Sequence, residues 1–121
     1  MNEPANDLLN AIVATIVRET DPEQIILFGS HARGTAREDS DIDLLIVERQ
    51  PFGPGRSRRQ EMTKLWRALA RFPVSKDLLL YSENEITHWQ GSINHVIGYA
   101  LREGQRVYER SRTSPSTVGN G

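Results

Sequence analysis

The sequence predicts an α+β domain in which a small mixed β-sheet of three to four strands is flanked by helices. Two observations carry this prediction. Short, apolar, β-branched runs of strand length alternate along the chain with longer segments whose apolar residues recur at helical spacing. The chain also has 121 residues, of which 37% are hydrophobic, which suits one folded core and is too little for two domains.

The first half of the chain is expected to contain a helix followed by two strands. Apolar residues at helical spacing predict an amphipathic helix over residues 7–19, which Asp21-Pro22 ends. The run Gln24–Phe28 (QIILF) is short and rich in β-branched residues, and therefore predicts a buried strand. A polar loop with at most a helical turn is expected over residues 31–40, and Asp41–Glu48 (DIDLLIVE) predicts a second buried strand.

The middle of the chain is expected to add a loop, a helix and a strand. The loop over residues 49–57 contains two prolines and two glycines. Helical spacing predicts a helix over residues 57–71, which Pro73 stops, and Ser75–Tyr81 (SKDLLLY) predicts a third strand. The residues expected on one face of this helix are Met62, Leu65, Trp66 and Leu69.

Both ends of the last predicted helix carry a recognisable signal. Ser82 with Glu85 three residues later forms a capping box, and Gly104 is a natural C-cap, so one helix is expected to run to about Glu103. Residues 105–110 (QRVYER) can form a last short strand. The domain is therefore expected to span residues 1–110. The tail 111–121 is expected to be disordered.

Composition excludes several classes of function. The absence of cysteine excludes disulfides, zinc–thiolate sites and cysteine nucleophiles, and it fits a cytoplasmic protein. A net charge of −1 provides no overall attraction to nucleic acid or to a membrane surface. The N-terminus starts acidic, unlike a signal peptide, and no apolar run is long enough to span a bilayer. We therefore expect a cytoplasmic protein that does not bind membranes and does not bind nucleic acid directly.

Two carboxylates open the second predicted strand. Asp41 and Asp43 are two residues apart, so in a strand their side chains project to the same face. Like charges at this spacing repel each other unless a cation lies nearby. Mg²⁺ is the obvious candidate because it takes carboxylate oxygens together with the phosphate oxygens of a substrate, and two such ions can stabilise the entering and leaving oxygens of a phosphoryl transfer. Taken alone, an Asp-x-Asp pair is more often a polar strand start that faces water.

Gly29-Ser30 directly follows the first predicted strand. Glycine permits backbone angles and close approaches that other residues forbid, and a serine hydroxyl with nearby backbone N–H groups can hold phosphate oxygens. Taken alone, this dipeptide is far more typical of an ordinary turn. Neither G-x-x-x-x-G-K-[ST] nor G-x-G-x-x-G occurs in the chain, so the two common glycine-rich nucleotide motifs are excluded.

The combination is more specific than its parts. Gly29-Ser30, a ten-residue spacer and Asp41-x-Asp43 together resemble the signature of the polymerase-β-like nucleotidyltransferase superfamily. With Arg33-Gly34 and Ser40 inside the spacer, the segment is similar to the minimal nucleotidyltransferase (MNT) branch. The strong match covers residues 25–47, and the order and length of the other elements match more weakly. The sequence departs from many MNT proteins directly after Gly-Ser, where a histidine replaces their arginine.

The resemblance implies which residues would form the site. A third carboxylate is expected on a neighbouring strand, and Asp77 is the only acidic residue inside the third predicted strand. The alternative for Asp77 is a strand-edge residue paired with Lys76 or an arginine. Arg37 is a further candidate phosphate contact, as its guanidinium matches phosphate geometry. The implied catalytic and metal-binding residues are Asp41, Asp43 and Asp77, with two Mg²⁺ ions, and the implied ATP-binding residues are Gly29, Ser30, Arg33 and Ser40.

The resemblance also implies an activity and a partner. MNT domains are often paired with HEPN-domain proteins as antitoxins, so we expect transfer of AMP from ATP to a hydroxyl, foremost a tyrosine, of a HEPN toxin. The resemblance also allows an oligomer with that partner. One alternative is a non-catalytic antitoxin that neutralises its partner by binding. Another is a small-molecule nucleotidyltransferase of the antibiotic-modifying type, which would need an acceptor pocket from a partner or a second copy. The basic segment 56–71 is interpreted as a solvated face rather than a contact for RNA or an acidic partner.

Overall fold

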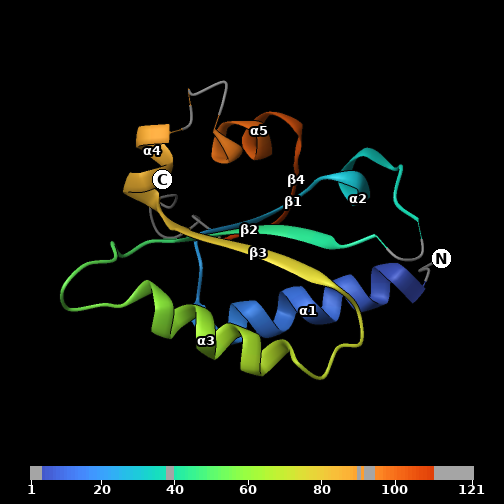
Figure 1. The fold of residues 1–121 in the computed structure, drawn as a ribbon, viewed down its shortest axis with the longest axis horizontal. Coiled ribbons are helices and arrows are strands. Elements are labelled where there is room, and N and C mark those ends of the chain that lie inside the picture. Colours follow the sequence, from blue (N-terminus) through green and yellow to red (C-terminus); the bar gives the residue numbers. More distant parts are fainter. Residues whose placement is uncertain (1–3, 38–39, 90, 92–94, 111–121) are drawn as a thin grey trace, which may run out of the picture.

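The computed structural model describes residues 4–37, 40–89, 91 and 95–110. Helices cover both faces of a four-stranded sheet (Figure 1). The elements are α1 (Pro4–Thr20), β1 (Gln24–Phe28), α2 (Ser30–Arg33), β2 (Ile42–Glu48), α3 (Arg58–Leu69), β3 (Lys76–Ser82), α4 (Glu83–Trp89), α5 (Val96–Glu103) and β4 (Gln105–Glu109). Across these residues, no helix has the length and hydrophobicity that a membrane-spanning segment needs.

The sheet is mixed, as the sequence predicts. Its strand order is β3-β2-β1-β4, in which β1 is antiparallel to both β2 and β4 while β2 and β3 run parallel. Phe28 at the end of β1 lies opposite Asp43 near the start of β2, and Asp43 lies opposite Asp77 near the start of β3. The end of β1 and the starts of β2 and β3 therefore meet at one edge of the sheet.

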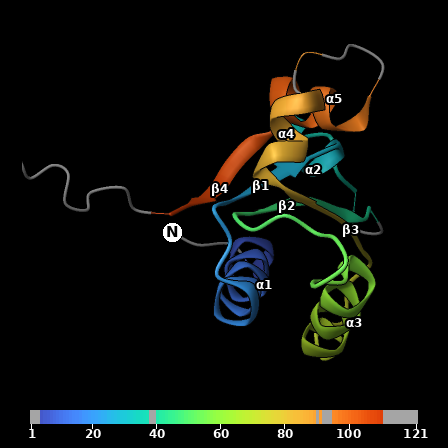
Figure 2. The same cartoon turned by 90° about the vertical axis from the view of Figure 1, so that its left-hand side faces the viewer.

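Two helical layers bury the two faces of the sheet. Helices α1 and α3 lie under one face, and α4 and α5 lie over the other, while α2 follows the end of β1 (Figure 2). In β2, Leu44 and Ile46 belong to the core on the α1–α3 side, whereas Leu45 and Val47 belong to the core on the α4–α5 side. Because both faces are covered, β2 is buried from Leu44 to its end, which is why its sequence is continuously apolar rather than alternating.

Helix α3 is confirmed, with one correction to its buried face. The hydroxyl of Ser57 caps the helix by accepting a hydrogen bond from the Gln60 N–H at 3.2 Å. Leu65 and Leu69 are fully buried against the sheet. Trp66 was expected beside them but is 39% exposed, because one residue after Leu65 lies about 100° around the helix, away from the core.

The single long helix predicted after Ser82 is wrong, because the structure has two helices, α4 and α5. Half of the expected capping box is present, since the Ser82 N–H donates to Glu85 Oε1 at 2.9 Å. Helix α5 has its own cap, in which His95 Nδ1 accepts from the Ile97 N–H at 3.1 Å. Gly91 lies between the helices, where its low helix propensity favours a break.

Gly104 ends α5 for a reason that differs from the predicted one. Its backbone is extended, with φ −86° and ψ 170°, and not left-handed as in a typical glycine C-cap. A Cβ at this position would lie 2.5 Å from both the Ala100 carbonyl oxygen and Ile26 Cγ2. Glycine is therefore required because α5 turns into β4 directly against β1. The predicted disordered tail, 111–121, lies outside the described residues.

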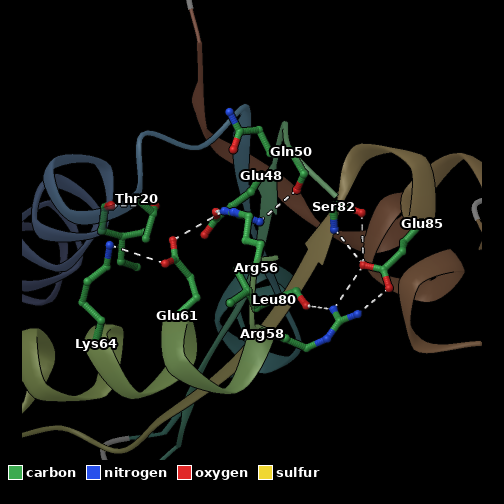
Figure 3. A network of polar contacts seen from close by, with 11 residues as sticks. Thr20, Glu48, Gln50, Arg56, Arg58, Glu61, Lys64, Leu80, Ser82 and Glu85 are labelled. Carbon is green, nitrogen blue, oxygen red and sulfur yellow. Dashed lines mark hydrogen bonds and ion pairs between the residues drawn. The ribbon is translucent and has the colours of Figure 1, made fainter. Parts of the chain in front are cut away.

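A buried carboxylate, Glu48, is the last residue of β2, at the end of the strand farthest from Asp43. Glu48 is 1% exposed and forms an ion pair with Arg56, which also pairs with Glu61 at 3.7 Å and donates to the Gln50 carbonyl at 2.9 Å (Figure 3). Burial raises the pKa of Glu48 to about 7, the neighbouring Glu61 adds to this rise, and Arg56 opposes it. This network fastens the loop after β2 and the start of α3 to the sheet.

Arg58 at the start of α3 fastens the edge strand β3. Its guanidinium donates to the Leu80 carbonyl at 2.6 Å and to both carboxylate oxygens of Glu85 (Figure 3). It also lies over the rings of Phe52 and Tyr81, at 4.7 and 5.3 Å from their centroids. The same side chain therefore links α3, β3 and α4.

Candidate active site

Three acidic side chains lie at the sheet edge where β1 ends and β2 and β3 begin. Asp43 and Asp77 are register partners on parallel neighbouring strands, so their backbones are about 4.8 Å apart and their side chains project from the same face. Asp41 lies one residue before β2. The face is the one that α4 and α5 cover, because Asp43 alternates with Leu44 and shares its side with Leu45. The structure thus places the three carboxylates that the sequence singles out at the same end of the sheet.

The charges around Asp43 act on one another. Burial raises the pKa of Asp43, and the negative charges of Asp77 and Asp41 raise it further. The neighbouring His31 and Arg33 lower the pKa of Asp43 but do not cancel the rise. Carboxylates that repel one another in this way are stabilised by any cation that binds between them.

Gly29 gives the Asp43 carboxylate its place. Its backbone has φ 76° and ψ −155°, a conformation that is essentially restricted to glycine. A Cβ on residue 29 would lie 2.2 Å from Asp43 Oδ2, so the carboxylate occupies the space that any other residue would fill. The glycine of the Gly-Ser motif is thus coupled directly to the second aspartate of the Asp-x-Asp motif.

Ser30 begins the short helix α2, which turns the chain back over the acidic edge. The Gly29 carbonyl accepts from the N–H groups of Ala32 and Arg33, each at 3.1 Å, and the Ser30 carbonyl accepts from Thr35 N–H at 3.0 Å. The hydroxyl of Ser30 makes no hydrogen bond to any residue that the structure describes. It is therefore free to bind a ligand.

The remaining predicted nucleotide contacts lie in and after α2. Arg33 donates a hydrogen bond to the hydroxyl of Tyr99 on α5. The hydroxyl of Ser40 accepts from the Arg37 N–H at 2.8 Å, and the Ser40 carbonyl oxygen lies 3.3 Å from His31 Nε2. Ser40 thus shapes the loop that leads into β2, whereas Arg33 and His31 contribute charge near Asp43.

Two residues that sequence reasoning missed also contact α2. Tyr99 accepts from Arg33, and Gln105 Nε2 on β4 donates to the Ala32 carbonyl at 2.8 Å. These contacts join residues 66 and 73 positions apart. No local pattern in the sequence could have indicated them.

The donor set of this edge fits Mg²⁺. Among the described residues, no three histidine, aspartate or glutamate side chains converge closely enough to hold a metal ion by themselves. Mg²⁺ does not need such a cage, because it keeps several waters and binds through one or two carboxylates and the phosphates of its substrate. Asp41, Asp43 and Asp77 supply hard oxygen donors at this end of the sheet, and Gly29 lets the Asp43 carboxylate lie directly against the backbone of the Gly-Ser turn.

Comparison with protein families gives a match over most of the chain. The family model described as "Nucleotidyltransferase domain" matches residues 11–102. A curated relative, the "Putative protein adenylyltransferase" of Methanocaldococcus jannaschii, is 32% identical over 68 residues, which are 56% of this chain and 63% of that protein. The match thus spans less than two thirds of that relative's length.

Solved structures share the fold. The "Structure of putative minimal nucleotidyltransferase" is 28% identical with a TM-score of 0.51, covering 79% of this chain and 85% of that one. A "putative nucleotidyltransferase from Sulfolobus solfataricus" is 20% identical with a TM-score of 0.55, covering 88% and 81%. A "toxin-antitoxin with AMP-PNP" is 22% identical with a TM-score of 0.51, covering 84% and 73%.

Proposed function

The chain belongs to the nucleotidyltransferase domain family, and from that premise we propose that it is an Mg²⁺-dependent adenylyltransferase that transfers AMP from ATP to a protein hydroxyl. One observation carries the proposal. Asp43 and Asp77 stand side by side on one face of the sheet, with Asp41 two residues away and the Asp43 carboxylate resting on Gly29. Such an edge suits two tasks, which are binding a metal-bound triphosphate and deprotonating an attacking hydroxyl.

The proposed reaction is an in-line displacement at the α-phosphorus of ATP. The acceptor oxygen forms a bond to this phosphorus while the bond to the β-phosphate oxygen breaks, and pyrophosphate leaves. Bound Mg²⁺ would supply positive charge against the phosphate oxygens. Asp41 and Asp43 would hold that cation, and Ser30 and Arg33 would bind phosphate oxygens. Asp77, exposed on the edge strand β3, would accept the proton of the attacking hydroxyl.

The proposed acceptor is a tyrosine hydroxyl on a HEPN-domain toxin, whose activity the modification would suppress. Two observations support a macromolecular acceptor. Asp77 lies on an edge strand and is exposed, so a partner protein can approach it from outside the sheet. The chain also resembles the minimal branch, and it shares its fold with a toxin–antitoxin complex that contains AMP-PNP.

Labelled ATP tests this proposal. The protein is incubated with ATP labelled at the α-phosphate, Mg²⁺ and a purified HEPN-domain toxin, and we expect label on the toxin. Asp43→Asn and Asp77→Asn should each lower the rate by about 100-fold or more, the scale on which the loss of one transition-state contact lowers kcat. Glu109→Gln on β4, an exposed carboxylate at the other end of β1, is the matched control and should transfer label normally.

The same assay separates the alternatives. Neutralisation of the toxin by the Asp43→Asn variant, with no label transferred by the unsubstituted protein, would contradict the enzyme and support a binding antitoxin. Label on a small hydroxyl compound such as an aminoglycoside, and none on the toxin, would support a small-molecule enzyme. Replacing the labelled toxin tyrosine with phenylalanine should abolish the transfer.

A further inference from the structure

The helix that carries Arg33 does not hold its own position. Helix α2 has four residues, too few for an isolated helix to be stable in water. Two side chains from the C-terminal part of the chain hold it: the Tyr99 hydroxyl at the Arg33 guanidinium and the Gln105 amide at the Ala32 carbonyl. The orientation of Arg33 therefore depends on α5 and β4, elements that carry none of the predicted site residues.

The core fixes Tyr99 in turn. Its ring packs edge-on against Phe28, with the ring centroids 6.3 Å apart and an angle of 84° between the planes. Phe28 is only 7% exposed, ends β1 directly before Gly29 and lies opposite Asp43. An edge-to-face pair between the buried Phe28 and the half-buried Tyr99 has a defined geometry. The Tyr99 hydroxyl is consequently aimed at Arg33 from the same face of the sheet that bears Asp43.

We propose that Tyr99 is a positioning residue that orients the Arg33 guanidinium toward the phosphates of bound ATP. This inference rests on the proposed function. An arginine has five donors, so one hydrogen bond to Tyr99 leaves the others for phosphate oxygens. An arginine side chain that is already ordered also loses less conformational freedom when the nucleotide binds. The effect of Tyr99 is therefore expected in nucleotide affinity and to depend on the presence of Arg33.

Tyr99→Phe removes the hydroxyl and keeps the ring that packs on Phe28. We expect the Kd for AMP-PNP with Mg²⁺, measured by calorimetry, to rise by about two- to tenfold, the range for one side chain that must be ordered on binding. In the transfer assay, KM for ATP should rise by the same factor while kcat changes less than twofold. Tyr108→Phe is the matched control, because this half-buried tyrosine packs on the α1–α3 side of the sheet and should bind AMP-PNP normally.

A double-mutant comparison distinguishes positioning from a general structural role. Arg33→Ala should weaken AMP-PNP binding, and adding Tyr99→Phe to that variant should have no further effect. Equal Kd values for Tyr99→Phe and the unsubstituted protein, or effects that add fully in the double variant, would overturn the inference and leave the proposed function intact. Failure of the unsubstituted protein to bind AMP-PNP would overturn both.

Discussion

Replacing Glu48 with glutamine is expected to change how stability depends on pH. Glu48 ends β2 with 1% of its surface exposed, and its Oε2 atom has no hydrogen-bond partner among the described residues. Burial and the neighbouring Glu61 raise its pKa from 4.5 to about 7, even though Arg56 lies beside it. Between pH 4.5 and about 7 the folded protein therefore keeps a proton on this carboxyl that the unfolded chain releases.

The sign and size follow from linkage between protonation and folding. Below pH 4.5 both the folded and the unfolded state carry the proton, so folding buries a neutral carboxyl and not a charge. Between pH 4.5 and 7 the unfolded chain loses its proton first, so the folded state becomes less stable as the pH rises. A rise in pKa of this size corresponds to about 3 kcal/mol, which is lost once the pH exceeds the folded-state pKa.

Urea unfolding at several pH values between 4.5 and 8, monitored by tryptophan fluorescence, measures this loss of stability. Glu48→Gln resembles the protonated carboxyl, so its free energy of unfolding should gain up to about 3 kcal/mol over that of the unsubstituted protein as the pH rises. Only the part of the difference in unfolding free energy that varies with pH reports the titration of Glu48. Glu61→Gln should shrink the dependence by removing the neighbouring charge, and Glu109→Gln should leave it unchanged. A difference between Glu48→Gln and the unsubstituted protein that does not vary with pH would refute the reasoning.

Three further substitutions test the packing. Gly29→Ala forces a strained backbone and pushes the Asp43 carboxylate aside, so urea unfolding should show a loss of about 1–3 kcal/mol and calorimetry a weaker affinity for Mg²⁺ with AMP-PNP. Gly104→Ala places a Cβ 2.5 Å from the Ala100 carbonyl oxygen, so overpacking should lower the free energy of unfolding by about 1–3 kcal/mol. Nucleotide affinity per folded molecule should change little. An unchanged urea midpoint would contradict this prediction. Leu69→Ala, at a fully buried position, should cost about 2–5 kcal/mol with an unchanged m-value in the same titration.

Strands β1, β2 and β3 could be predicted because each contains a short apolar run bounded by turn residues. The predicted bounds of Gln24–Phe28 agree with β1, and the predicted second strand differs from β2 by one residue, Asp41. The single helix after Ser82 was wrong because the break at Gly91 is a local preference that a capping signal upstream does not reveal. The exposure of Trp66 depends on how α3 sits on the sheet, which hydrophobicity alone does not determine.

In the candidate site too, the features that depend on nearby residues could be predicted, and those that depend on distant contacts could not. That Asp41 and Asp43 lie at the start of the second strand is readable from the sequence, although β2 begins at Ile42 and the strand alternation therefore does not fix the direction of the Asp41 side chain. That Asp77 stands beside Asp43 follows from the parallel register of β2 and β3, which the sequence indicated only through a family resemblance. Tyr99 was missed because its contact with Arg33 joins residues 66 positions apart. The catalytic and binding roles of these residues stay predictions.

The Arg58 side chain affects whether strands from other molecules can add to the edge of the sheet. Strand β3 is an outer strand rich in leucine, the kind of exposed rim to which another polypeptide can add as an extra strand. Arg58 occupies the Leu80 carbonyl on that strand, and Lys76 adds a second positive charge. A strand added from a second copy would have to displace this charged hydrogen bond, which disfavours self-association and fibre growth along β3. This is the same edge strand from which an acceptor would reach Asp77.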